Sequence, residues 1–405
     1  MKILNLHGFM GEADNKNYKA LCEIVPAENI ISPQLHYKEN SPQKILNILS
    51  ALVDSENFIF VGQSLGGWFA DQLSRKFGCP CILTNPCCYP HELEIIRDSG
   101  ISAEFVEQYR EMSVHNKNER AYTLCSDADT VIPDNDKNCK KLSQYITSVH
   151  GSHSTIENVG EHLSALLTEV QNDSLLLFLG RGSAFADDHN SAYFVKDNDL
   201  VLIDCPATSY QKVKKMKWEH FDNIYILITH THGDHSGGVG TMLQYIWFAS
   251  GMKKKVTIIA PSEEVRADLL LLMRIEGCEA SWFNIVTANE LHKNWLVSAV
   301  PTTHVKPLER KCFGYHLNIH GKNVIYTGDT ATIESFKPLL SAGSFLYTEA
   351  AYYKSDVHLY LKDMLPEFIQ LAENGVHVYL MHLDVENEIR KLIEETPIKL
   401  AALKC

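Results

Sequence analysis

The segment ILITHTHGDHSGG, at positions 226–238, constrains the fold of this chain more than any other. Its apolar start predicts a buried strand, and His230 and His232 follow, two residues apart, where that strand ends. Asp234 and His235 come next, before a helix expected to begin at the glycine pair that ends the segment. Two imidazoles can bind one metal ion while an Asp–His pair binds a second. Imidazole and carboxylate are suitable ligands for zinc, iron or manganese.

Three further ligands are expected where later strands end. His304 closes LVSAVPTTH, Asp329 closes NVIYTGD and His382 closes VHVYLMH. Strand ends are rigid places for a site, and a carboxylate such as that of Asp329 can bridge two cations ~3.5–4 Å apart. One histidine alone could be an ordinary core residue, but seven potential ligands in this pattern predict a dinuclear centre. It would hold two divalent cations, with Zn²⁺ expected and Mn²⁺ or Fe²⁺ as alternatives, through His230, His232, Asp234, His235, His304, Asp329 and His382.

Such a centre predicts hydrolysis. Two cations lower the pKa of a shared water towards ~7, so that hydroxide is available at neutral pH. Asp234 is expected to bind a cation and is the candidate to accept the proton. The hydroxide would attack phosphorus or a carbonyl carbon in line with the leaving group, and the cations would neutralise the charge that builds up.

From Leu175 to the C-terminus the sequence resembles the metallo-β-lactamase superfamily. HTHGDH fits the family's HxHxDH motif and TGDT fits its bridging-aspartate motif. LGRGSAF, HNSAYFV, LVLIDCP and TEAAYYKSDVHLYL are similar to the RNase Z and phosphodiesterase branch. The resemblance implies an αββα sandwich over residues 175–405. It also implies that His358 stabilises or protonates the departing oxyanion and that Glu349 orients a neighbouring side chain.

The sequence departs from RNase Z in one interval. The long tRNA-clamping arm of that enzyme would lie between His304 and Asp329, and only two dozen residues separate them here. The formal net charge is −13, whereas a long polyanion is normally bound by a basic surface. We therefore expect a small-molecule phosphodiester or similar ester as substrate, and no long nucleic acid.

The ligand pattern also separates relatives within the superfamily. Flavodiiron proteins carry Glu at the position of His232, so electron transfer to oxygen is disfavoured. Metallo-β-lactamases proper lack the bridging Asp that Asp329 supplies, so antibiotic hydrolysis is disfavoured. A glyoxalase II-like thioesterase or a lactonase keeps all seven ligands and stays open as an alternative.

The first 167 residues alternate short apolar strands with amphipathic helices, which predicts a parallel sheet covered on both faces. FIFVGQSLGGWFA contains GxSxG at residues 62–66, after a strand and before a helix, as this motif requires. Its glycines allow a tight turn that lifts Ser64 above the sheet. The oxyanion hole is then expected from the Leu65 N–H and, in the loop after the first strand, the Phe9 N–H.

A serine nucleophile needs a base and an acid that orients the base. The order Ser…Asp…His is typical of this fold. Asp129 in SDADTVIP supplies the acid, and His153 supplies the base from SVHGSHS, a segment that we expect to enter a loop. Asp127 and His150 are close competitors for the same two roles.

The stretches LHGF, VGQSLGG, TNPCCYP, DTVIP and GSH make residues 1–170 similar to the small YqiA-like serine esterases of the α/β-hydrolase fold. The resemblance implies hydrolysis of short acyl esters through Ser64. The polar stretch Gln171–Ser174 separates this half from the second. We therefore interpret the chain as a bifunctional hydrolase. The alternative from another class is a ligand-sensing protein with a catalytically silent N-terminal domain.

Composition bears on location and partners. The eleven cysteines include no CxxC pair, so we expect reduced, mostly buried thiols in a cytoplasmic protein. The N-terminus lacks the features of a secretory signal, and no run approaches the ~20 apolar residues needed to cross a bilayer. We expect no membrane partner, and a homo-oligomer is compatible with the sequence.

Overall fold

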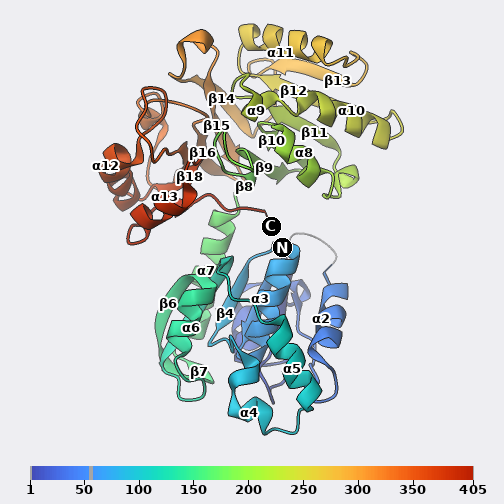
Figure 1. Ribbon diagram of the computed structural model, residues 1–405, viewed down its shortest axis with the longest axis vertical. Coiled ribbons are helices and arrows are strands. Elements are labelled where there is room, and N and C mark those ends of the chain that lie inside the picture. Colours follow the sequence, from blue (N-terminus) through green and yellow to red (C-terminus); the bar gives the residue numbers. More distant parts are fainter. Residues whose placement is uncertain (1, 54–57, 405) are drawn as a thin grey trace. The chain divides into compact units, whose positions relative to one another are not determined.

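The computed structural model describes residues 2–53 and 58–404. The chain forms two compact units, Met1–Ser174 with Lys404–Cys405, and Leu175–Leu403 (Figure 1). The polar stretch Gln171–Ser174 was expected to separate the two halves, and the change of unit falls directly after it. The stretch is not a loop, because residues 171–173 lie in helix α7. Within the described residues, no helix has the length and apolar character to cross a membrane.

The N-terminal unit contains a seven-stranded sheet with the order β2-β1-β3-β4-β5-β6-β7. Neighbouring strands are parallel except for the final β6–β7 pair. The strands are β1 (Lys2–Leu6), β2 (Ile30–Ile31), β3 (Phe58–Gln63), β4 (Cys81–Thr84), β5 (Asn118–Ala128), β6 (Ser143–Ser152) and β7 (Thr155–Ile156). The helices are α1 (Lys16–Ile24), α2 (Pro42–Ala51), α3 (Leu65–Phe77), α4 (Glu94–Arg97), α5 (Ala103–Met112), α6 (Asn135–Leu142) and α7 (Val159–Asp173).

This sheet carries a hydrophobic core on each face, because successive strand residues point to opposite sides. Leu4 and Phe60 pack with residues of α2, α3 and α5 on one face. Ile3 and Ile59 pack with α1 and α7 on the other. A mostly parallel sheet with helices on both faces confirms the predicted α/β-hydrolase fold.

One segment of this unit differs from its prediction. SVHGSHS was expected to be a loop, but its first five residues, 148–152, belong to strand β6. Val149 pairs with Ser126 of β5, and Gly151 pairs with Ile156 of β7. Pairing on both sides outweighs the weak strand preference of Gly and Ser in the isolated sequence.

The C-terminal unit contains two six-stranded sheets, ordered β13-β12-β11-β10-β9-β8 and β14-β15-β16-β17-β18-β19. The first sheet comprises β8 (Leu177–Gly180), β9 (Ser191–Lys196), β10 (Asp199–Ile203), β11 (Asn223–Leu227), β12 (Val256–Ala260) and β13 (Phe283–Thr287). The second comprises β14 (Leu296–Pro301), β15 (Phe313–Ile319), β16 (Lys322–Tyr326), β17 (Phe345–Glu349), β18 (His377–Met381) and β19 (Lys399–Leu400). The helices are α8 (Ala207–Val213), α9 (Gly233–Ser236), α10 (Val239–Ala249), α11 (Glu263–Ile275), α12 (Leu361–Glu373) and α13 (Glu386–Ile393).

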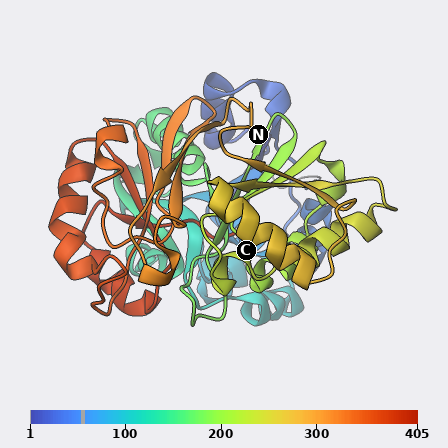
Figure 2. The same cartoon turned by 90° about the horizontal axis from the view of Figure 1, so that it is seen from above.

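Three buried clusters show that this unit has four layers. One lies between the sheets and joins Val201 and Leu227 of the first to Leu317 and Tyr347 of the second. Another packs α8, α10 and α11 on the outer face of the first sheet. The third packs α12 and α13 on the second sheet. Figure 2 shows the red helices on one side of the strands and the yellow-green helices on the other. The order helix, sheet, sheet, helix confirms the predicted αββα sandwich.

Candidate active sites

Four of the expected metal ligands lie at the end of β11 in the first sheet. His230 and His232 follow the strand, and Asp234 and His235 lie in the one-turn helix α9. This helix closes because the His232 carbonyl accepts hydrogen bonds from the His235 and Ser236 N–H groups at 3.0 and 2.9 Å. Asp234 and His235 were expected before a helix that begins at the glycine pair. The structure places them inside a short helix of their own.

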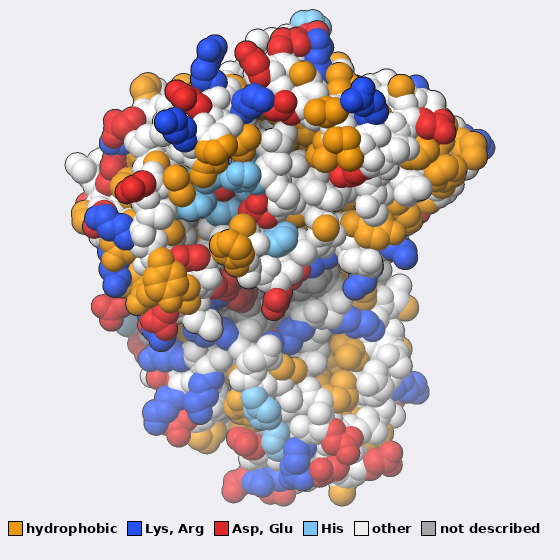
Figure 3. Space-filling model, turned by 45° about the horizontal axis from the view of Figure 1, so that its top comes forward, with side chains coloured by type: hydrophobic (Ala, Val, Ile, Leu, Met, Phe, Trp, Pro, Cys, Tyr) orange, Lys and Arg blue, Asp and Glu red, His pale blue; other side chains and the backbone are white. Residues whose placement is uncertain are grey.

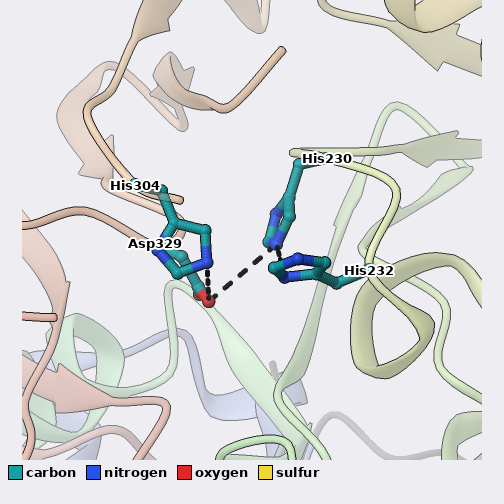
Figure 4. Close-up of side chains that lie close together, drawn as sticks. All are labelled: His230, His232, His304 and Asp329. Atoms are coloured by element: carbon teal, nitrogen blue, oxygen red, sulfur yellow. Dashed lines mark hydrogen bonds and ion pairs between the residues drawn. The ribbon is translucent and has the colours of Figure 1, made fainter. Parts of the chain in front are cut away.

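The other three ligands come from the second sheet. His304 follows β14, Asp329 follows β16 and His382 follows β18. All seven side chains form two neighbouring groups, and within each group the ligand atoms lie within 4.8 Å of one another. The first group is His230, His232, His304 and Asp329, shown in Figure 4, and the second is Asp234, His235 and His382.

The Asp329 carboxylate faces both groups. Its Oδ1 lies 3.3 Å from His235 Nε2 and 3.4 Å from His382 Nε2. Its Oδ2 lies 3.6 Å from His304 Nε2 and 3.9 Å from His230 Nε2. One oxygen of a single carboxylate is therefore directed at each group, which is the arrangement that a ligand shared by two cations requires.

The charges within the two ligand groups favour the binding of cations. His235 Nε2 and Asp329 Oδ1 are buried and are among the described atoms that have no hydrogen-bond partner. Burial opposes ionisation of Asp329, but the charges of His382 and His235 outweigh it and hold the pKa of its carboxyl well below the usual range. Burial also opposes the charged form of His235, yet Asp329 and Asp204 hold its pKa well above the usual range. Ionised carboxylates that face buried nitrogen donors suit divalent metal ions.

Asp204 is a residue that the sequence analysis missed. It follows β10, is fully buried, and accepts a 2.8 Å hydrogen bond from His235 Nδ1. Its other oxygen accepts the Thr229 N–H at 2.8 Å. The carboxylate therefore fixes the His235 ring with Nε2 towards Asp329. An Asp directly after the apolar run LVLI is the same signal that identified Asp329, and it could have identified Asp204.

Asp204→Asn is expected to weaken metal binding about 10–100-fold, because outer partners of this kind orient a ligating imidazole and increase its basicity. Competition with a chromogenic chelator would measure the change in affinity. Asp222→Asn, at an exposed position of the same unit, is the matched control. Equal metal affinity in Asp204→Asn and wild type would show that Asp204 does not orient His235 for metal binding.

Glu349 and His358 lie beside the expected metal ligands. His358 Nδ1 donates a 2.7 Å hydrogen bond to Glu349 Oε2, and the Thr330 N–H donates to the other oxygen of that carboxylate. Burial, and then the nearby Asp329, raise the pKa of Glu349 well above its usual range. The His358 ring is partly exposed and lies 4.9 Å from the ring of His304. His358 is thus the neighbouring side chain that the Glu349 carboxyl contacts. Figure 3 shows histidines at the surface of this unit, bordered by carboxylates and hydrophobic side chains.

In the N-terminal unit, hydrogen bonds connect Ser64, His153 and Asp129. Ser64 Oγ donates to His153 Nε2 at 2.9 Å, and His153 Nδ1 donates to Asp129 Oδ2 at 2.9 Å. The backbone N–H groups of Val131 and Ile132 donate to Asp129 Oδ1. Burial opposes ionisation of Asp129, but these partners outweigh it and lower its pKa. The set has the geometry of a catalytic triad.

The competing pair lies elsewhere. His150 Nδ1 and Asp127 Oδ2 are 2.5 Å apart and form an exposed ion pair with each other. Ser64 Oγ makes its hydrogen bond with His153 instead, and hydrogen bonding between Asp127 and His150 lowers the pKa of the Asp127 carboxyl. The structure therefore brings Asp129 and His153, and not Asp127 and His150, to the serine.

The turn that carries Ser64 is tight, as the GxSxG motif predicts. Ser64 has φ +51°, between β3 and α3. A Cβ at Gly66 would lie 2.3 Å from the Leu6 carbonyl oxygen, so no larger residue fits there. The loop after β1 also passes close to the serine, since a Cβ at Gly8 would lie 3.1 Å from Ser64 Cβ. Phe9 follows Gly8, and Leu65 follows Ser64. Their N–H groups therefore remain the candidates for the oxyanion hole.

Comparison with known proteins agrees with both halves of this description. The model of an uncharacterised protein family, UPF0227, matches residues 2–169. The Anti-Pycsar protein Apyc1 of Bacillus phage 010DV004 is 25% identical over 231 residues, or 51% of this chain and 88% of the phage protein. A ribonuclease Z of Methanococcus maripaludis is 33% identical over 94 residues, or 22% of this chain and 30% of that enzyme.

Among solved structures, the metallo-β-lactamase-fold protein YhfI from Bacillus subtilis is similar over 56% of this chain and 95% of its own. The sequence identity is 16% and the TM-score 0.45. The chain is a hydrolase. The model of the family Anti-Pycsar protein Apyc1 matches residues 174–396, more than half of the sequence. The chain therefore belongs to this family.

Proposed function

We propose that the C-terminal unit is a dinuclear metallohydrolase that cleaves the phosphodiester of a cyclic nucleotide. The observation that carries this proposal is the Asp329 carboxylate, which turns one oxygen to each of two ligand groups. The relatives favour phosphodiesters over thioesters and lactones, since Apyc1 proteins act on cyclic nucleotides. We further propose that the N-terminal unit is a serine esterase for short acyl esters, through Ser64, His153 and Asp129.

Different residues of the C-terminal unit would bind the cations, orient the ligands and donate a proton. The seven ligands would hold two divalent cations, which supply a water of lowered pKa and neutralise charge on the phosphate. Asp204 and the Val357 carbonyl each accept the Nδ1 proton of a ligand, His235 and His304 respectively. They thereby leave Nε2 of both rings free to bind a cation. His358, oriented by Glu349 through Nδ1, would give a proton from Nε2 to the departing oxygen.

His358→Ala should lower hydrolysis of a 3′,5′-cyclic nucleotide about 10²–10⁴-fold, the usual contribution of a general acid. The loss should be much smaller with bis-p-nitrophenyl phosphate, because p-nitrophenolate leaves without protonation. Steady-state rates on both substrates test this contrast. Equal losses on both would argue that His358 is structural.

In the N-terminal unit, the reaction would use the hydrogen bonds that run from Ser64 to His153 and on to Asp129. Ser64 Oγ attacks the acyl carbonyl as His153 Nε2 takes its proton, and Asp129 stabilises the resulting imidazolium. The Leu65 and Phe9 N–H groups would bind the oxyanion. The His153 imidazolium would then give its proton to the departing alcohol as the ester C–O bond breaks, and water would release the acyl group by the same route.

Selective inhibition of the full chain tests both activities at once. A chelator should abolish hydrolysis of cyclic nucleotides and leave p-nitrophenyl acetate hydrolysis intact. A fluorophosphonate should do the reverse. If thioesters or lactones were cleaved in a chelator-sensitive way and cyclic nucleotides were not, the substrate class would be wrong. If neither domain turned over any substrate, a ligand-sensing role would replace both proposals.

A further inference from the structure

The triad acid has one partner that the mechanism above does not use. Asp129 Oδ2 accepts the hydrogen bond from His153 and a second one, at 3.1 Å, from Asn135 Nδ2. Asn135 is the first residue of helix α6 and is buried, with 6% of its surface exposed. A hydrogen bond to the ionised carboxylate holds the oxygen that orients His153.

A thiol fixes the orientation of this amide. Cys139 lies one helical turn after Asn135, and its S–H donates to Asn135 Oδ1 at 3.5 Å. Because the thiol contacts the carbonyl end, the amino end of Asn135 is directed at Asp129. Cys139 is completely buried. Its donor is therefore protected from exchange with water.

A second thiol lies against the first. Cys88 Sγ is 4.0 Å from Cys139 Sγ. Cys88 belongs to the segment after β4 and is only partly buried, so small oxidants can reach it. All ten cysteines within the described residues are free thiols. A continuous series of contacts thus runs from an accessible thiol, through Cys139, Asn135 and Asp129, to His153.

We propose that Asn135 is a positioning residue for the triad acid and that the Cys88–Cys139 pair makes esterase activity sensitive to hydroperoxides. This proposal rests on the proposed esterase function. A disulfide requires an S–S distance near 2.05 Å. Sγ of Cys139 must therefore move towards Cys88, and its hydrogen, the donor to Asn135 Oδ1, is lost. The amide then no longer has a fixed orientation, and Asp129 loses a hydrogen bond.

The oxidation balances with one hydroperoxide. The Cys88 sulfur attacks the peroxide oxygen, the O–O bond breaks, and the Cys88 proton leaves with the alcohol or water formed. The Cys139 sulfur then attacks the sulfenic sulfur of Cys88, and water departs with the Cys139 proton. Two thiols lose two electrons in total, and the peroxide is reduced. Dithiothreitol reverses the disulfide by exchange.

Substitutions of Cys139 test the positioning role. Cys139→Ala removes the donor and should lower kcat for p-nitrophenyl acetate about tenfold, with KM unchanged. Cys139→Ser supplies a hydroxyl donor and should restore most of this loss. Asn135→Ala should match Cys139→Ala, with thermal unfolding as the check on folding. If the alanine and serine variants of Cys139 had equal activity, the donor would be irrelevant and the role refuted.

Oxidation of the full chain tests the thiol pair. Hydrogen peroxide should lower wild-type esterase activity about tenfold, dithiothreitol should restore it, and peptide mapping should find a Cys88–Cys139 disulfide. Cys88→Ser should keep its basal activity and resist peroxide. Equal sensitivity of Cys88→Ser and wild type would overturn the proposal. A disulfide between Cys139 and Cys125, a thiol of strand β5 that also contacts Cys139, would overturn it as well. If reduced wild type failed to react with a fluorophosphonate at Ser64, the esterase proposal itself would fail. The peptide map would still report on the thiols.

Discussion

Asp329→Asn should lower hydrolysis of a cyclic nucleotide by about 10³-fold or more. Two cations contribute several kcal/mol to stabilising the transition state, and each 1.36 kcal/mol is tenfold in rate. An amide has one oxygen instead of two and no charge, so it cannot serve both ligand groups that the carboxylate faces at 3.3–3.9 Å. Steady-state rates and metal content by elemental analysis would be measured together, with circular dichroism as the check on folding.

Two comparisons sharpen this expectation. Asp222→Asn changes the same functional group at an exposed position of the unit and should behave as wild type. Asp329→Asn should keep its esterase activity, since Ser64, His153 and Asp129 all belong to the other compact unit. Full turnover with two bound metal ions in Asp329→Asn would end the assignment of this residue as the shared ligand.

Ser64→Ala should lower hydrolysis of p-nitrophenyl acetate by about 10⁵–10⁶-fold, the size of effect that removal of a serine nucleophile produces. The acyl-enzyme cannot form without Oγ, and His153 then has no hydroxyl to deprotonate. The variant should also lose labelling by a fluorophosphonate. Cyclic-nucleotide hydrolysis should stay within about twofold of wild type, so Ser64→Ala and Asp329→Asn are reciprocal controls. Esterase activity that survives in Ser64→Ala would exclude this triad.

Much of both candidate sites could be predicted because their residues lie at strand ends and turns with fixed spacing. His230, His232, Asp234 and His235 fall within six residues, so local geometry alone brings them together. Ser64 is similar, since the tight turn that carries it leaves no room for a Cβ at Gly62 or Gly66, and the GxSxG motif records both glycines. His304, Asp329 and His382 lie far apart in the sequence, and each was found because an apolar strand ends just before it.

The rest depended on contacts between distant segments. Asp204 follows an apolar strand as Asp329 does, but its hydrogen bond to His235, 31 residues later, becomes visible only in the fold. The choice between Asp129 and Asp127 could not be made from order, because both precede both histidines. Pairing of β5 with β6 accompanies the observed choice, and the last residues of β6, HGS, do not resemble a strand. Asn135 and Cys139 carry no motif at all, and only the fold places them beside the triad acid.

The two sets of proposed ligands, one from each sheet, have a consequence for assembly. His230, His232, Asp234 and His235 extend from one sheet, and His304, Asp329 and His382 extend from the other. Metal ions bound there would link the two sheets, in addition to the apolar residues packed between them. The free energy of metal binding would then also stabilise the packing of the two sheets against each other. All seven residues could bind the cations only after the two sheets have packed together.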